Sequence, residues 1–155
     1  MDLYDLQIKN PKLFPQFSVK DTLVLHYNCP QRDEIVQLYS KYTQVLFTLS
    51  GKRVQKHGDQ IWVHSPGKGG LLKKCAFLQE LPPDYSGWNT LAFYAKDDYL
   101  RSVFDEFRSH LSLTDLPEPN KEMVEMFEID EQIRSCYESF LPYFGTDKSA
   151  AGEPP

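Results

Sequence analysis

Between positions 17 and 95, apolar residues alternate with polar ones in short runs that are separated by turn residues. The run at 22–27, for example, is rich in β-branched and aromatic residues and is followed by Asn28 and Pro30. Alternation with a period of two places neighbouring side chains on opposite faces of a strand. We therefore expect strands at 22–27, 35–39, 43–49, 52–56, 60–64, 71–80 and 88–95.

Turn residues join these runs at short intervals. Ser50-Gly51 and the segment 57–59 are typical of tight hairpin turns. The segment 66–70 contains three glycines and is expected to be a loop between strands. Short strands about 8–12 residues apart are typical of a small sandwich or barrel. Residues 1–16, with two prolines, are expected to form an irregular N-terminal arm.

From residue 96 the apolar period becomes helical. A first stripe recurs every three or four residues, follows Asp97 and Asp98, and predicts an amphipathic helix. After a proline-containing connection at 112–120, a second stripe predicts another helix that ends at Gly145. The first stripe contains Leu100, Val103, Phe104 and Phe107. The second contains Ile129, Ile133, Cys136, Tyr137, Phe140, Leu141 and Phe144.

These patterns predict a mainly β fold with C-terminal helices (α+β), in which a small barrel or sandwich precedes two amphipathic helices. The expected organisation is an arm at 1–16, a barrel at 17–95, a helical dimerisation region at 96–145 in the same domain, and a linker or tail at 146–155. The second stripe is wide for a helix on one flank of a small barrel. Packing against the sheet and contact with another subunit both explain it.

Composition narrows the class of protein. With 155 residues the chain fits one domain, and ten Phe, nine Tyr and two Trp predict a core rich in aromatic rings. The net charge of −5 argues against nucleic-acid binding by this chain alone, because such binding depends on Lys and Arg. Three separated cysteines predict neither disulfides nor a zinc site. With no signal peptide or apolar membrane span, we expect a cytoplasmic protein that has no membrane partner.

No pattern of catalytic residues rises above background. His-x-His, which would project metal ligands from one strand, does not occur, and neither does the Gly-x-Ser-x-Gly nucleophile elbow. Asp97-Asp98 and Asp130-Glu131 stand at expected helix starts, where capping explains them. We therefore expect no enzyme activity, no metal and no cofactor.

A binding pocket inside the barrel remains the main candidate site. Strand alternation places Trp62 and His64 on one face of their strand, and Trp88 and Tyr94 on one face of the last strand. Polar groups among aromatic rings are typical of small-ligand pockets, although a barrel can also fill its own interior with side chains. The candidate ligand-binding residues are His26, Trp62, His64, Trp88 and Tyr94.

The order of features resembles that of the cupin-like N-terminal domain of AraC-type transcription regulators, and most of all the branch that includes the type III secretion activators. The resemblance covers about residues 17–144. It lies in the stretches VLFTLSGKRVQKHG, LLKKCAFLQELP and LAFYAKDDYLRSVF, and in the terminal SFLPYF.

The resemblance implies a regulatory domain that senses a small-molecule effector or a protein partner and forms a homodimer. Family members read DNA through a second domain with two helix-turn-helix units, and this chain has no such pattern. DNA binding is therefore expected only through a C-terminal domain absent from this chain. The implied dimer contact is Ile133, Tyr137, Phe140 and Leu141, with Leu100, Val103, Phe104 and Phe107 as the competing surface.

Two other functions stay open at this point. One is a small cupin-type enzyme whose metal is held by His26 and His64, if these side chains face the same interior. The other is a stand-alone interaction domain that pairs with another regulator.

Overall fold

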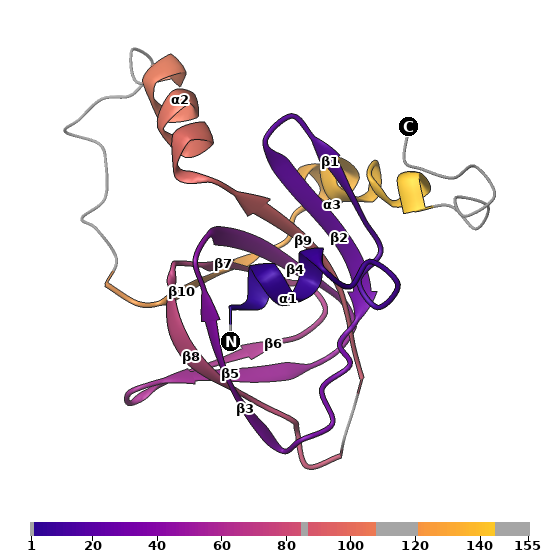
Figure 1. Cartoon of the computed structure of the whole chain (residues 1–155), viewed down its shortest axis with the longest axis vertical. Coiled ribbons are helices and arrows are strands. Elements are labelled where there is room, and N and C mark those ends of the chain that lie inside the picture. The colour runs from indigo at the N-terminus through magenta and orange to yellow at the C-terminus, as the bar shows by residue number, and fades with distance from the viewer. Residues whose placement is uncertain (1, 85–86, 108–120, 145–155) are drawn as a thin grey trace.

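Two antiparallel β-sheets make up the body of the computed structural model, which describes residues 2–84, 87–107 and 121–144 (Figure 1). The larger sheet has the order β1 (Gln16–Val19), β2 (Thr22–Asn28), β9 (Trp88–Ala95), β4 (Thr43–Gly51), β7 (Lys68–Leu72) and β10 (Val124–Glu128). The smaller sheet has the order β3 (Ile35–Ser40), β8 (Cys75–Glu80), β5 (Arg53–His57) and β6 (Gln60–His64). The predicted mainly β fold class is confirmed.

Helical segments accompany the two sheets. They are α1 (Leu3–Ile8), α2 (Asp97–Phe107), α3 (Glu131–Glu138) and the 3₁₀ turn η2 (Leu141–Phe144). Figure 1 shows α2 projecting away from both sheets, whereas α3 lies beside β1 and β2. Within the described ranges, no helix has the length and apolar content needed to cross a membrane.

The two faces of the larger sheet have different roles. Leu25, Leu46 and Tyr94 point into the space between the sheets and share one buried cluster. Val24 and Phe47, their neighbours along β2 and β4, belong to a separate buried cluster on the outer face. Side chains alternate along a strand, so this sheet presents one surface to the interior and another to the C-terminal helix.

On the outer face, α3 docks through aromatic contacts. The Tyr137 ring is buried and stacks on Phe47 with a centroid distance of 4.7 Å. Phe140 packs edge-on against Phe93 at 5.1 Å. Asp130 caps the helix N-terminus by accepting a 2.8 Å hydrogen bond from the Ile133 backbone N–H. The second apolar stripe therefore packs, at least in part, against its own sheet.

Residues 1–16 were predicted to be an arm or an irregular lead-in, and this is wrong for Leu3–Ile8, which form α1. Asp2 accepts a 2.9 Å hydrogen bond from the Asp5 backbone N–H and caps α1. Leu3 and Gln7, which are four residues apart on one face of the helix, are both buried. The sequence does contain a signal for this helix, namely an acidic N-cap residue followed by apolar residues at helical spacing. The prediction gave more weight to the two prolines that follow.

The single strand predicted at 71–80 is wrong, and the loop predicted at 66–70 is wrong for residues 68–70. β7 begins at Lys68 in the larger sheet, and β8 begins at Cys75 in the smaller one. Gly69 and Gly70 lie within β7, where neighbouring rings occupy the space that a side chain would take. A Cβ atom at Gly69 would be 2.3 Å from the Phe127 ring, and one at Gly70 would be 2.9 Å from the His64 ring.

The region predicted to be helical, 96–145, contains the strand β10. It pairs antiparallel with β7 from Val124 opposite Leu72 to Glu128 opposite Lys68, and so forms the last strand of the larger sheet. The run VEMFE has no consistent apolar face, because Val124 and Met126 share one face with Glu128, and Phe127 shares the other with Glu125. Its pairing depends on the neighbouring strand rather than on its own sequence.

Candidate ligand-binding site

A cavity of about 490 Å³ lies between the two sheets. This volume is within the roughly 300–1,000 Å³ range of small-molecule pockets. The apolar part of its lining comes from α1 and from strands of both sheets. It includes Leu3, Leu6, Phe14, Tyr27, Val36, Leu38, Leu46 and Trp88.

The polar part of the lining is dominated by glutamine. Gln7 comes from α1, Gln44 from β4, Gln55 from β5 and Gln79 from β8, and all four are buried. Gln31 joins them from the segment between β2 and β3. The same segment brings Arg32 and Asp33, both exposed, to the edge of the cavity.

A chain of amide hydrogen bonds crosses the smaller sheet. Gln55 Nε2 donates to Gln79 Oε1 at 3.1 Å, and Gln79 Nε2 donates to Gln31 Oε1 at 3.0 Å. His64 Nε2 lies 2.8 Å from Gln55 Oε1, so we assign its proton to Nε2. Burial lowers the pKa of His64 to about 4, which keeps the imidazole neutral at pH 7.

Two tyrosines supply hydroxyl groups to the same interior. Tyr94 donates a 2.6 Å hydrogen bond to Gln7 Oε1 and so joins β9 to α1. Burial raises the pKa of Tyr94 and of Tyr27, so both hydroxyls stay protonated under physiological conditions. The Trp88 indole N–H donates to Thr48 Oγ1 at 2.9 Å. These groups provide hydrogen bonds without charge.

Some buried amide groups have no partner. The Gln44 amide lies beside the Tyr94 hydroxyl, and the Gln7 amide and the Thr90 hydroxyl lie beside the Tyr27 hydroxyl. Even so, neither Nε2 nor Oε1 of Gln44 has the geometry of a hydrogen bond with any part of the chain that the structure describes. Within the same residues, Gln7 Nε2 and the Thr90 hydroxyl are also unpaired. Buried polar groups are nearly always satisfied in native proteins, so these atoms mark places where a bound molecule would form hydrogen bonds.

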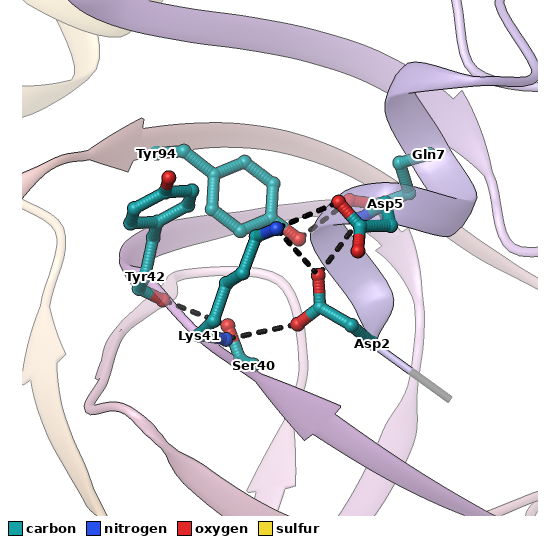
Figure 2. A network of polar contacts seen from close by, with 7 residues as sticks. All are labelled: Asp2, Asp5, Gln7, Ser40, Lys41, Tyr42 and Tyr94. Carbon is teal, nitrogen blue, oxygen red and sulfur yellow. Dashed lines mark hydrogen bonds and ion pairs between the residues drawn. The ribbon is translucent and has the colours of Figure 1, made fainter.

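Helix α1 forms one wall of the cavity, and a polar network holds it to the β3–β4 turn (Figure 2). Lys41 Nζ lies 2.8 Å from Asp5 Oδ1 and 3.9 Å from Asp2 Oδ2. The Lys41 backbone N–H donates to Asp2 Oδ1 at 3.0 Å. The hydrogen bond and charge of Lys41 lower the pKa of the Asp5 carboxyl, as expected for an ion pair.

The structure brings four of the five predicted ligand-binding residues to the interior. Trp88 lines the cavity directly. His64 and Tyr94 hydrogen-bond to the lining amides of Gln55 and Gln7. Trp62 is buried in the cluster that also contains the lining residues Leu3 and Leu38.

His26 is not part of this group, because it lies on the opposite face of the larger sheet. Its Nε2 is 3.1 Å from Asn89 Oδ1, and its ring packs edge-on to Phe144 at 5.4 Å. The metal-enzyme alternative required His26 and His64 to face one interior, and the sheet separates them. Across the described residues, no three His, Cys, Asp or Glu side chains gather as a metal site would require.

The predicted dimer residues occupy different environments. Tyr137 is buried, and Ile133, Phe140 and Leu141 are half-buried against the same outer cluster. On α2, Leu100 is 39% exposed and Val103 is half-buried. The side chains of Phe104 and Phe107 fall outside the described part of the structure. An open apolar groove of about 700 Å³ runs along this face, and its lining includes Leu100, Phe93, Ile133 and Phe140.

Sequence reasoning missed the glutamines. In β4, Gln44 and Thr48 alternate with Val45, Phe47 and Leu49, a pattern that usually means a solvent-facing polar side. Here the polar side faces the interior and the apolar side lies under α3. Gln44 and Thr48 are both almost fully buried. The clue was the second apolar stripe, since a helix that covers the outer face needs an apolar surface beneath it.

Comparison with solved structures shows similarity of fold. ToxT K231A from Vibrio cholerae, in its apo form, matches with a TM-score of 0.55 and 16% identity over 84% of this chain and 51% of its own. ToxT with a bound unsaturated fatty acid matches with a TM-score of 0.56 and 13% identity over 83% and 48%. ToxT bound to (E)-4-(8-methylnaphthalen-1-yl)but-3-enoic acid matches with a TM-score of 0.56 and 12% identity over 81% and 49%.

This chain spans about half the length of the ToxT chains that it matches. No protein-family model matches the sequence. No curated protein matches it either. The similarity to known proteins therefore lies in the fold alone.

Proposed function

We propose that this chain is the effector-binding regulatory domain of an AraC-family transcription regulator. The observation that carries the proposal is the cavity between the sheets, which has apolar walls and unpaired buried amides. ToxT, an AraC-family regulator of similar fold, is known with a fatty acid and with a naphthalenyl butenoic acid bound. That precedent supports a small-molecule effector for this chain.

The arrangement suggests how occupancy would be transmitted. β4 carries Leu46 into the cavity and Phe47, the next residue, against Tyr137 of α3. One layer of backbone thus separates the effector space from the docked helix. A ligand that favours one spacing of the two sheets would shift the population of docked and displaced α3. The proposal assigns binding and no catalysis, because neutral amides dominate the polar lining.

Further parts of the proposal rest on the sequence resemblance. We propose that the domain works as a homodimer in the cytoplasm and that a C-terminal domain outside this chain reads DNA. Exposure of Leu100 beside the apolar outer groove supports a dimer contact on that side. Placement in the type III secretion activator branch, with control by a protein partner, is a narrower proposal that rests on the quoted stretches.

The ligand site is tested with N-phenyl-1-naphthylamine, a neutral probe that fluoresces in apolar pockets. We expect one saturable site per chain. Leu46→Trp fills the cavity and should weaken binding at least tenfold, whereas Val63→Trp, at an exposed position of β6, should leave it unchanged. Equal binding by both variants would place the probe elsewhere and count against an interior effector site.

The regulatory role is tested in cells with the complete reading frame and a transcriptional reporter. We expect that frame to encode two helix-turn-helix units and the reporter to respond to the protein. Leu46→Trp should fix the reporter in one state, and Val63→Trp should behave as the parent. A frame with no DNA-binding region would instead favour a stand-alone interaction domain.

A further inference from the structure

We infer that the ligand of the interior cavity is an uncharged molecule with an amide-like group, one that donates and accepts hydrogen bonds at adjacent atoms, on an apolar body. This inference deepens the proposed function and rests on it, since it assumes that the cavity is an effector site. It names a chemical class that includes carboxamides, lactams and ureas, and it excludes carboxylates as the preferred ligands.

Gln44 carries the inference. Its side chain is fully buried and lines the cavity. Both its amide nitrogen and its amide oxygen lack a partner among the described residues. A ligand that satisfies this side chain must offer an acceptor to Nε2 and a donor to Oε1. A neutral amide offers both groups at adjacent atoms, whereas a carboxylate offers acceptors only.

A second unpaired donor lies on another wall. Gln7 Nε2, from α1, lies beside the Tyr27 hydroxyl but forms no hydrogen bond of normal geometry in the described parts of the chain, and Tyr94 occupies only Oε1 of that amide. The interior therefore presents two free donors and one free acceptor from these glutamines. By contrast, Gln55 and Gln79 hydrogen-bond to each other, Gln55 also to His64 and Gln79 also to Gln31. These two amides therefore require few further hydrogen bonds from a ligand.

The charges around the cavity disfavour an anion. The charged residues of the lining, Arg32 and Asp33, are neighbours of opposite sign, and both are exposed at its edge. Arg53 is buried in β5 but is not part of the lining, and its Nη1 donates to the Lys52 carbonyl. A carboxylate drawn inside would lose its water without gaining an opposite charge, which is strongly unfavourable.

The apolar residues of the cavity lining determine which apolar body the ligand can have. Phe14, Tyr27 and Trp88 provide ring surfaces, and Leu46 of the larger sheet and Leu38 of the smaller one add aliphatic surface. A flat ring system or a medium-length alkyl chain would bury its surface against these groups. Two probe pairs cover the two shapes: 2-naphthamide with 2-naphthoate, and octanamide with octanoate.

The test is calorimetric titration of each pair at pH 7.5, where both acids are ionised. We expect each amide to bind at least tenfold more tightly than its acid. In Gln44→Met, which keeps the volume of the side chain and removes its hydrogen bonds, the amide should lose at least tenfold in affinity and the acid should change little. Gln132→Met, the same substitution at an exposed position of α3 that is not part of the cavity lining, is the matched control.

The ligand-free protein gives a second readout. Gln44→Met removes a buried unpaired amide, so its melting temperature should equal or exceed that of the parent. A merely structural role for Gln44 would lower it. If this variant fails to fold, the ratio of amide to acid affinity in the parent protein decides alone, and Gln7→Met provides the second variant.

Several outcomes would overturn the inference. Acids that bind as tightly as amides would do so, as would amides that do not bind or amide affinity unaffected by Gln44→Met. Acid binding that Arg32→Gln abolishes would place the anion at the cavity edge. In each case the naphthylamine probe still tests the proposed function. The loss of probe binding in Leu46→Trp depends on the cavity and not on the chemical class of the ligand.

Discussion

At the scale of single residues, the burial of His64 has a consequence for pH dependence. The pKa of this side chain is lowered from an unfolded value near 6.5 to about 4 in the folded protein. Between these values the unfolded chain binds the proton and the folded protein does not. Stability from this residue is therefore complete above pH 6.5 and is lost as the pH falls towards 4, by about 3 kcal/mol in total.

The measurement is urea unfolding at pH 7 and at pH 4.5 for the parent and for His64→Gln. We expect the parent to lose roughly 2 kcal/mol more than the variant between these two pH values. His57→Gln, at an exposed histidine, is the control and should follow the parent. Equal losses in the parent and in His64→Gln would mean that His64 is protonated in the folded state.

Gly69 leads to a packing prediction. A Cβ atom at this position would lie 2.3 Å from the Phe127 ring, so Gly69→Ala must displace that ring and loosen the pairing of β7 with β10. We expect a loss of about 1–3 kcal/mol in the free energy of unfolding. Gly87→Ala, where a Cβ atom would have no neighbour within 4 Å, should have little effect. Similar melting curves for both variants would show that Phe127 moves freely.

At the scale of elements, α1 depends on polar contacts more than on its own length. The helix is short, and Asp2 both caps it and bonds to the Lys41 backbone. We expect Asp2→Ala to destabilise the docked helix by about 1 kcal/mol, which corresponds to roughly fivefold faster hydrogen exchange of its amides.

Mass spectrometry of hydrogen exchange would check this prediction. Protection should fall in peptides that contain α1 and stay constant in β9, and Asp21→Ala, at an exposed turn residue, should change neither. A change spread evenly over both sheets would instead show that α1 is part of one cooperative unit with the sandwich.

The elements differ in how well the sequence predicted them. β4 and β9 were predicted because their alternation is strong and turn residues bound them. The first half of 71–80 was misread because Lys73-Lys74 do not resemble a break, although the chain passes there from one sheet to the other. β10 could not be predicted, since its pairing partner is a glycine-containing strand that had been read as a loop.

At the scale of the whole molecule, α2 leaves apolar surface uncovered. Leu100 is 39% exposed and borders the outer groove. If this side forms the homodimer contact, Leu100→Asp should weaken dimerisation at least tenfold, because it places a carboxylate in an apolar interface. Sedimentation equilibrium over a concentration series measures this, with Ile61→Asp, on the exposed face of the smaller sheet, as control.

A parent protein that remains monomeric at the highest concentration would contradict the dimer proposal. Weakening by Ile61→Asp but not by Leu100→Asp would move the contact to the smaller sheet. Either result leaves the interior cavity and its proposed ligand class untouched, because neither residue lines it.

The candidate site was predicted only in outline. Alternation placed Trp62, His64, Trp88 and Tyr94 on interior faces, which follows from the period of a strand. The amides were missed because a glutamine facing inward has the same local pattern as one facing solvent. Only the tertiary arrangement, with α1 supplying Gln7 and the two sheets supplying the rest, brings these side chains together.

The register of β4 makes the fold unusually sensitive to the number of residues that precede this strand. Deleting one residue before Gln44 would turn every following side chain of the strand over, so that glutamine and threonine would lie under Tyr137 and phenylalanine would fill the chamber. A bulge at Thr48–Ser50 and the turn at Gly51, whose Cβ would collide with the Gly87 carbonyl, mark the far end of this register. Single-codon deletions here should therefore be far more damaging than most substitutions.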